Sequence, residues 1–225
     1  MEFTLLWAAL TAIASMWVGL RIWDDRLPDR PLDRLIGASV LGLFVGRIAA
    51  MLSQGINPLA NPADIIIVRG GVAAPAATLA ALAAIFWPER DNPSAVDALA
   101  PAAVLGLAGW HAGCLWRGAC LGAASDLPWA WSGPTSEITR HPIEVYAAIA
   151  LIAGAWLVSR LGWRPLLRTG TALGLASLVR LVTEPLRPTL SGGPIGWYAA
   201  GVVVGLFIAV LGPRLTRKPR TPVPT

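Results

Sequence analysis

The sequence predicts an all-α membrane protein with seven transmembrane helices, the amino terminus outside and the carboxyl terminus in the cytoplasm. Charged residues make up only 14% of the 225 residues, against about 25% in ordinary globular proteins. Hydrophobic residues make up 55%. Seven apolar runs approach the roughly 20 residues that a helix needs to cross a bilayer: 3–20, 35–52, 70–87, 96–109, 143–158, 166–182 and 195–211. This composition excludes an ordinary soluble domain.

The first four runs differ in how clearly they predict helices. Run 3–20 lacks the basic leader and cleavage site of a secretory signal, so we expect it to remain as a helix. Run 35–52 carries Arg47 well inside it. Run 70–87 follows two Asn-Pro turns and the apolar stretch 65–68, which we expect to lie at the membrane interface. Run 96–109 is the weakest, because it is short and carries Asp97 near its start.

The last three runs are joined by short connections. A basic turn, 161–168, separates the fifth run from the sixth, and a glycine-containing return, 186–198, leads to the seventh. We therefore predict one polytopic domain over residues 1–212. Residues 213–225 are basic and proline-rich, as is typical of a disordered tail.

Basic residues predict the orientation of the chain. With the amino terminus outside, five basic residues lie on the outer side: Arg69, Arg117, Arg140, Arg180 and Arg187. Twelve lie on the cytoplasmic side: Arg21, Arg26, Arg30, Arg34, Arg90, Arg160, Arg164, Arg168, Arg214, Arg217, Lys218 and Arg220. This excess satisfies the positive-inside tendency. The net charge of +5 therefore indicates topology and contact with anionic membrane lipids, and not nucleic-acid binding.

The segment 110–146 gathers most of the reactive side chains. It contains both histidines, His111 and His141, and both cysteines, Cys114 and Cys120. Polar groups in a membrane protein are costly unless they bind or react, so this segment predicts a site. Histidine and cysteine are also zinc and copper ligands. Their spacing here matches no compact metal motif, and cysteines in membrane helices are more often small buried side chains, so we expect no metal.

Three arginines suggest recognition of an anionic lipid. Arg47, Arg140 and Arg180 belong to different elements, and we hypothesise that they converge on one head group. A guanidinium matches phosphate geometry with two parallel hydrogen bonds. Arg180 and Glu184 are four residues apart and share a helical face. Simple pairing between these two residues remains an alternative.

Five stretches resemble, in order along most of the chain, the motifs of prolipoprotein diacylglyceryl transferases. GLAGWHAGCLWRGACLGAASDLPWAW resembles the family signature, and RHPIEVY resembles its Arg-His-Pro-x-x-Leu-Tyr element. VGRIAAML, NPADIIIVRGGVAAP and SLVRLVTEPLR resemble the other three. The resemblance implies transfer of a diacylglyceryl group from phosphatidylglycerol to the lipobox cysteine thiol of a preprolipoprotein. A thioether would form and glycerol phosphate would leave, at a polar cavity near the outer leaflet of the bacterial inner membrane, without any cofactor.

The residues themselves and the resemblance together lead us to assign roles to individual residues. Those assigned to catalysis are His141, His111 and Tyr146. Those assigned to the lipid phosphate are Arg180, Arg140, Arg47, Arg117 and Glu184. Those that keep the structural frame of the signature are Gly113, Gly118, Gly122, Asp126 and Pro128.

Three positions depart from the family pattern. The signature arginine of the family aligns with His111, its expected base aligns with Pro75, and a tyrosine near the start of the first helix is replaced by Trp7. Arg117, which the family does not require, is a candidate to compensate for the lost arginine. The departures leave a second interpretation open, a phospholipid-binding relative with impaired or altered chemistry. A transporter is less consistent, because the polar groups cluster at the outer face and not at the bilayer midplane.

Overall fold

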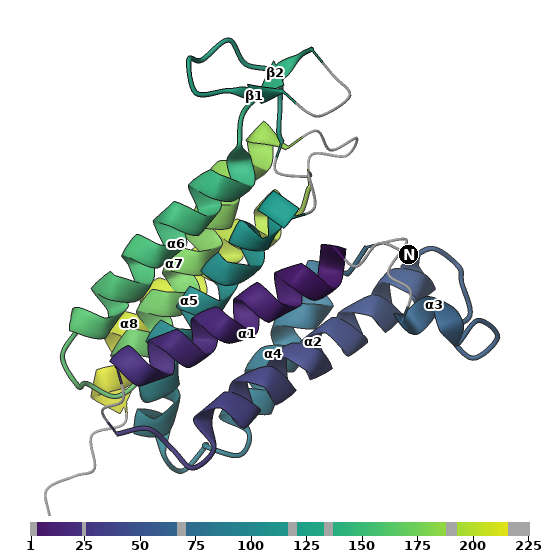
Figure 1. Ribbon diagram of the computed structural model, residues 1–225. Coiled ribbons are helices and arrows are strands. Elements are labelled where there is room, and N and C mark those ends of the chain that lie inside the picture. Colours follow the sequence, from purple (N-terminus) through teal and green to yellow (C-terminus); the bar gives the residue numbers. More distant parts are fainter. Residues whose placement is uncertain are drawn as a thin grey trace, which may run out of the picture.

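The computed structural model describes residues 4–23, 26–66, 71–116, 121–132, 137–187 and 193–215. Its long helices are α1 (Thr4–Ile22), α2 (Pro31–Ser53), α4 (Ala74–Phe86), α5 (Pro93–Ala112), α6 (Ile143–Arg160), α7 (Leu167–Thr183) and α8 (Ile195–Leu215). The short elements are α3 (Ala63–Ile66), η1 (Gly113–Trp116), η2 (Glu184–Leu186) and the strands β1 (Trp131–Ser132) and β2 (Thr139–Arg140). Successive long helices run in opposite directions, and the β1–β2 hairpin projects from one end of the bundle (Figure 1). We call this end the hairpin end and the other the opposite end.

Each predicted apolar run lies on one of the long helices. Four of these, α2, α5, α6 and α8, are long and apolar enough to cross a membrane. Helices α1 and α4 are apolar but shorter, and α7 is the least apolar of the set. The protein is therefore a mostly helical membrane protein with several apolar helices, whereas the number of spans and their orientation remain predictions.

Small residues bring neighbouring helices into close contact. In α5, Gly109 lies against Thr11 of α1, whose hydroxyl donates a 2.9 Å hydrogen bond to the Gly109 carbonyl. In α2, Gly46 lies against Ala77 of α4, and its carbonyl accepts a 2.9 Å hydrogen bond from the amide of Ala73. Glycines allow such approaches because they carry no side chain, which is the common packing mode of membrane helices.

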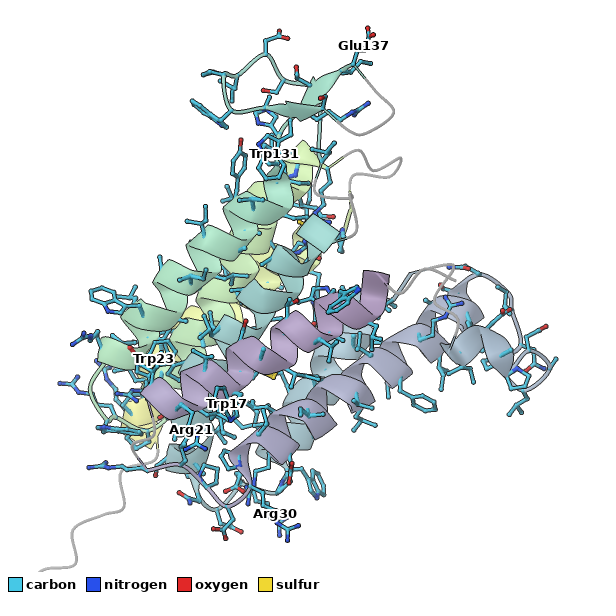
Figure 2. All side chains as sticks on the ribbon, viewed as in Figure 1. Trp17, Arg21, Trp23, Arg30, Trp131 and Glu137 are labelled. Atoms are coloured by element: carbon cyan, nitrogen blue, oxygen red, sulfur yellow. The ribbon has the colours of Figure 1, made fainter. Side chains whose placement is uncertain are left out.

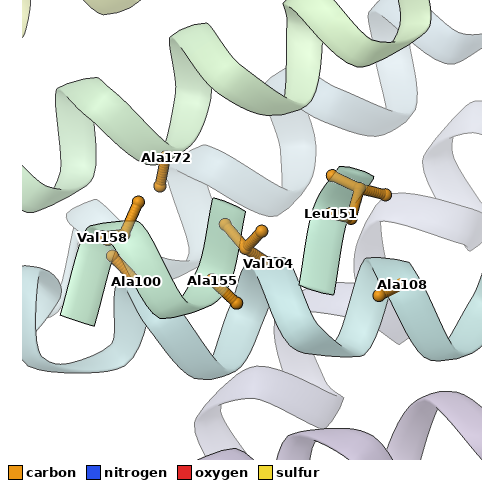
Figure 3. Close-up of a cluster of buried hydrophobic side chains, with 7 residues drawn as sticks. All are labelled: Ala100, Val104, Ala108, Leu151, Ala155, Val158 and Ala172. Atoms are coloured by element: carbon orange, nitrogen blue, oxygen red, sulfur yellow. The ribbon is translucent and has the colours of Figure 1, made fainter. Parts of the chain in front are cut away.

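A buried cluster joins the three central helices. It combines Ala100, Val104 and Ala108 of α5 with Leu151, Ala155 and Val158 of α6 and Ala172 of α7 (Figure 3). Small and medium apolar side chains alternate in this cluster, so the helices can interdigitate closely. The cluster fixes the positions of α5, α6 and α7, whose ends carry most of the candidate site.

Helices α7 and α8 should separate if a large side chain is placed at Gly205. A Cβ at this position would lie 2.5 Å from the Gly174 Cα atom and 2.7 Å from the Gly170 carbonyl oxygen. We expect Gly205→Leu to lower the free energy of unfolding by about 1–3 kcal/mol, as overpacking does, measured as a lower thermal unfolding midpoint in detergent. Gly196 of the same helix has open space around it, so Gly196→Leu should change the midpoint little. Equal midpoints for the two variants would contradict this packing.

The weakest predicted run turns out to be a central helix. Helix α5 has 20 residues and is the most deeply buried of the four long apolar helices. Asp97, only 2% exposed, does not interrupt it. One carboxylate oxygen accepts hydrogen bonds from the Thr169 amide at 2.8 Å and the Thr169 hydroxyl at 2.6 Å. Since Leu166 at the start of α7 has no side-chain acceptor, Asp97 of α5 caps that helix instead.

Some boundaries differ from the prediction. Helix α4 begins at Ala74 and not at residue 70. The predicted interfacial stretch 65–68 overlaps the short helix α3, and its last two residues lie outside the described residues. Helix α8 continues through Pro213 to Leu215, beyond the predicted domain end at residue 212. Pro213 has no amide hydrogen, so one intrahelical hydrogen bond is lost near the end of α8. Residues 216–225 of the predicted tail lie outside the described part.

Candidate functional site

The hairpin end is held together by backbone hydrogen bonds. The Gly122 amide donates to the His141 carbonyl at 2.8 Å, and the His141 amide donates to the Ala123 carbonyl at 3.0 Å. The Ala123 amide donates to the Leu186 carbonyl at 2.7 Å, which ties this segment to the end of α7. Strands β1 and β2 pair in antiparallel register farther out. The hairpin is therefore fixed onto the ends of α6 and α7.

A connected set of side chains lies below the hairpin, and we call it the charge network. It consists of His111, Glu144, Arg187, Glu184, Arg180 and Tyr198. These residues come from the end of α5, the start of α6, the end of α7 with η2, and the start of α8. Four helices that are distant in sequence thus contribute to one polar group.

The network is continuous from His111 to Tyr198. His111 Nδ1 lies 2.5 Å from Glu144 Oε2, and the other oxygen of Glu144 pairs with Arg187. Arg187 Nε lies 3.5 Å from Glu184 Oε2. Arg180 Nη2 donates to that same oxygen at 2.9 Å and to the Tyr198 hydroxyl at 3.1 Å. The Arg180 guanidinium also lies over the Tyr198 ring, 5.2 Å from its centroid.

Burial makes this network unusual. His111 is 8% exposed and Glu184 is 4% exposed. Buried charges are tolerated when they are paired and hydrogen-bonded, and here two glutamates face two arginines. The predicted pairing of Arg180 with Glu184 is therefore present, and it forms part of a larger group that balances its own charge.

His141 and Tyr146 lie beside the network, at the base of the hairpin. The rings of His141 and Tyr146 are 6.2 Å apart in an edge-to-face arrangement. The Tyr146 hydroxyl accepts a 2.8 Å hydrogen bond from the indole nitrogen of Trp129. His141 Nδ1 is buried and has no hydrogen-bond partner among the described residues. The backbone of His141 organises the turn into α6, and its side chain packs on Tyr146.

The other two candidate arginines have separate partners. Arg47, 3% exposed, donates to the Asp64 carbonyl at 2.8 Å and to the Gly71 carbonyl at 3.1 Å. It therefore ties α3 to the chain that enters α4. Arg140 donates to the Gly122 carbonyl at 3.2 Å. Neither contact joins these arginines to Arg180, so their convergence on one head group remains a hypothesis.

The frame residues of the signature divide into packed and exposed positions. A Cβ at Gly113 would lie 2.5 Å from the Ala8 Cα atom of α1, and Gly122 packs against Leu186 and Ile143. Asp126 and Pro128 are exposed on the hairpin. Gly118 and the candidate Arg117 lie outside the described residues.

The described part of the chain contains no group of three or more histidine, cysteine or acidic side chains that could hold a metal ion. Cys114 is buried, as expected, and it is also disulfide-bonded, which the sequence interpretation did not anticipate. A disulfide sulfur is not a thiolate, the form that binds metals.

Two cavities lie at the opposite end of the molecule. The larger, about 540 Å³, is lined by residues of the α6–α7 turn and of α8: Trp163, Arg164, Pro165, Leu167, Ala209, Val210, Pro213 and Arg214. The smaller, about 210 Å³, lies between α2, α5, the end of α4 and the turn that follows α4. Neither is lined by a candidate site residue. The predicted polar cavity at the outer face therefore stays a prediction.

Sequence reasoning missed three members of the charge network as site residues: Glu144, Arg187 and Tyr198. A signal for Arg187 was present, because Arg180, Glu184 and Arg187 follow the i, i+4, i+7 spacing of one helical face. Glu144 lies within the polar segment 110–146, whereas Tyr198 gave no signal. Their role depends on how the starts of α6 and α8 meet the ends of α5 and α7.

Comparison with known proteins agrees with the motifs along the whole chain. The family model described as prolipoprotein diacylglyceryl transferase matches residues 3–217. The chain is 29% identical over 239 residues to the phosphatidylglycerol–prolipoprotein diacylglyceryl transferase of Pseudomonas putida (strain W619), covering 93% of this chain and 88% of that protein. It is 29% identical over 223 residues to the protein of that name from Nitratidesulfovibrio vulgaris (strain DSM 19637 / Miyazaki F), covering 89% and 82%. A relative from Polynucleobacter necessarius subsp. necessarius (strain STIR1) is 34% identical over 124 residues, covering 51% and 47%.

The family match covers every long helix and both sides of the charge network. The two relatives matched over most of their length are both named phosphatidylglycerol–prolipoprotein diacylglyceryl transferase. The chain belongs to the prolipoprotein diacylglyceryl transferase family.

Proposed function

We propose that this protein transfers the diacylglyceryl group of phosphatidylglycerol to the lipobox cysteine thiol of a preprolipoprotein. The match of residues 3–217 to the transferase family is the observation that carries this proposal. In this reaction the thiol sulfur attacks the glyceryl carbon that bears the phosphate ester. A carbon–sulfur bond forms, the carbon–oxygen bond breaks, and glycerol phosphate leaves with the bonding electrons. The reaction needs an activated thiol and cations that hold the phosphate.

The hairpin end offers groups of both kinds. Arg180 and Arg140 are the described arginines of this end that we assign to the lipid phosphate, with Glu184 holding Arg180 in place. Arg47 of α2 and Arg117, which lies outside the described residues, complete the proposed phosphate-binding set. His111, His141 and Tyr146 are assigned to the acceptor side of the reaction. Guanidinium groups suit this role because they remain charged and offer several donors in one plane.

We propose that seven helices cross the bacterial inner membrane, with the hairpin end outside. Arginine–tryptophan pairs at the opposite end support this orientation. Arg21 lies 5.5 Å from the Trp17 ring centroid, and Arg160 lies 5.2 Å from that of Trp156. Trp17, Arg21, Trp23 and Arg30 lie at this end, whereas Trp131 and Glu137 lie at the hairpin end (Figure 2). Tryptophan and arginine together are typical of a cytoplasmic membrane interface.

Transfer can be tested by complementation of a bacterial strain depleted of its own transferase. Expression of the chain should restore growth and the incorporation of labelled fatty acid into lipoproteins. The chain's membrane insertion must be verified by fractionation, so that a missing protein is not taken for an inactive one. A correctly inserted chain that fails to rescue, but still binds phosphatidylglycerol after purification, would favour the lipid-binding relative. In that case the departures at His111 and Pro75 have removed the chemistry.

A further inference from the structure

The two histidines of this chain differ in how their rings are held. His111 Nδ1 lies 2.5 Å from Glu144 Oε2, whereas His141 Nδ1 is buried without a partner. A histidine that takes a proton from a nucleophile commonly has its other ring nitrogen oriented by a carboxylate. Among the described residues, only His111 has this arrangement.

The charged groups around His111 are equal in number. Glu144 and Glu184 carry two negative charges, and Arg180 and Arg187 carry two positive charges within the same network. Because these four groups already balance, His111 is not required as a third cation. An uncharged ring would donate its Nδ1 hydrogen to Glu144 and leave the Nε2 lone pair for a proton.

We propose that His111 is the base that activates the acceptor thiol and that Glu144 is the positioning residue that holds it. This inference rests on the proposed transferase function. The cysteine S–H proton passes to His111 Nε2, and the resulting thiolate attacks the glyceryl carbon. The carbon–oxygen bond to the phosphate breaks, and glycerol phosphate leaves. The imidazolium then returns its proton to the departing phosphate or to water, so the enzyme ends unchanged.

Glu144 is well placed for this role because both of its oxygens are occupied. One oxygen contacts His111 and the other pairs with Arg187, so the carboxylate has little freedom to rotate. Its position as the second residue of α6 puts it directly after the turn that His141 organises. Helix α5 supplies the base, α6 supplies the positioning carboxylate, and the end of α7 fixes that carboxylate through Arg187.

The proposal predicts a specific pH dependence. The charged groups around His111 in the described part of the chain are Glu144 on α6, Arg180 on α7, and Glu184 and Arg187 directly after it. The described part of α1, which also packs here, carries only Arg21, at the opposite end. A general base acts in its proton-free form, so the proposed role predicts that transfer by the wild type rises with pH and then levels off. A role as a phosphate-holding cation predicts the reverse.

The experiment measures glycerol phosphate release by the purified full chain with phosphatidylglycerol micelles and a lipobox peptide. We expect His111→Gln to lower kcat by about 10²- to 10⁴-fold, the usual contribution of a general base. Glu144→Gln should lower kcat by at least about tenfold, with little change in KM for phosphatidylglycerol, and Glu144→Asp should recover part of the loss. His111→Arg restores the arginine of the family and should nevertheless remain inactive.

Two further measurements separate positioning from folding. Nitrogen-15 NMR of histidine-labelled protein should show an Nδ1-protonated, neutral His111 in the wild type, and a change of tautomer in Glu144→Gln. The matched control is Glu89→Gln, which breaks the ion pair of Glu89 with Arg34 at the opposite end and should leave transfer unchanged. Thermal unfolding identifies any variant that has lost its fold. If a variant is lost in this way, the pH profile and the NMR spectrum of the wild type still test whether His111 is the base.

The outcomes distinguish the two proposals. An inactive wild type overturns the proposed function and this inference with it. An active wild type with unchanged kcat in Glu144→Gln overturns the inference alone. Full activity in His111→Arg, or a rate that falls as pH rises, assigns His111 to phosphate binding and also overturns its role as the base.

Discussion

Replacing Asp97 with alanine is expected to lower the free energy of unfolding by about 2–4 kcal/mol. The variant would leave the Thr169 amide and hydroxyl buried without an acceptor, and each unsatisfied group costs about 1–3 kcal/mol. Because Asp97 and Thr169 belong to α5 and α7, the loss would loosen the packing between two central helices. Thermal unfolding in detergent, followed by tryptophan fluorescence, should show a clearly lower midpoint.

Asp97→Asn is the matched variant. The amide oxygen of asparagine can accept the same two hydrogen bonds, so we expect a loss of less than about half of that in Asp97→Ala. Such a difference would assign the effect to the acceptor and not to the change in size or charge. An Asp97→Ala midpoint equal to that of the wild type would show that the contact with Thr169 does not stabilise the fold.

The position of Asp97 also shows where sequence reasoning about the fold reaches its limit. Apolar runs predict helices well, because each helix must satisfy its own backbone groups inside a bilayer. All seven runs accordingly lie on helices. The same hydropathy rule counts a buried aspartate against a span, since the rule sees one segment at a time. The cap that Asp97 provides for α7 joins residues 72 positions apart. The sequence of neither segment alone indicates this contact.

The sequence indicated which segments contribute residues to the charge network, but it did not indicate which side chains pair with one another. The dense segment 110–146 does supply His111 and Glu144, and the 180–187 face supplies the arginines. Arg47 shows the reverse case. A buried arginine in an apolar run suggests a ligand, yet its described donors bind the carbonyls of Asp64 and Gly71. Backbone carbonyls are present in every loop, so no sequence pattern could have identified these partners.

Removal of the Arg180 side chain is expected to weaken binding of phosphatidylglycerol. Nη2 of Arg180 is committed to Glu184 and Tyr198, but its side chain is still 23% exposed, which leaves donors for a phosphate. Hydrogen bonds to charged groups contribute about 1.5–3 kcal/mol each. We therefore expect Arg180→Ala to raise the Kd by roughly 10- to 1000-fold, measured by titration with fluorescent phosphatidylglycerol in neutral detergent micelles.

Arg180→Lys tests whether shape as well as charge matters. Lysine preserves a cation beside the buried Glu184, so the variant should unfold close to the wild-type midpoint. It lacks the planar fork that binds two phosphate oxygens at once, so its Kd should still rise about tenfold. Arg164→Ala, an exposed arginine at the opposite end, is the control and should bind as the wild type does. If Arg180→Ala inserts correctly and keeps the wild-type Kd, Arg180 does not contact the head group, and its charge serves only to hold Glu184 in the network.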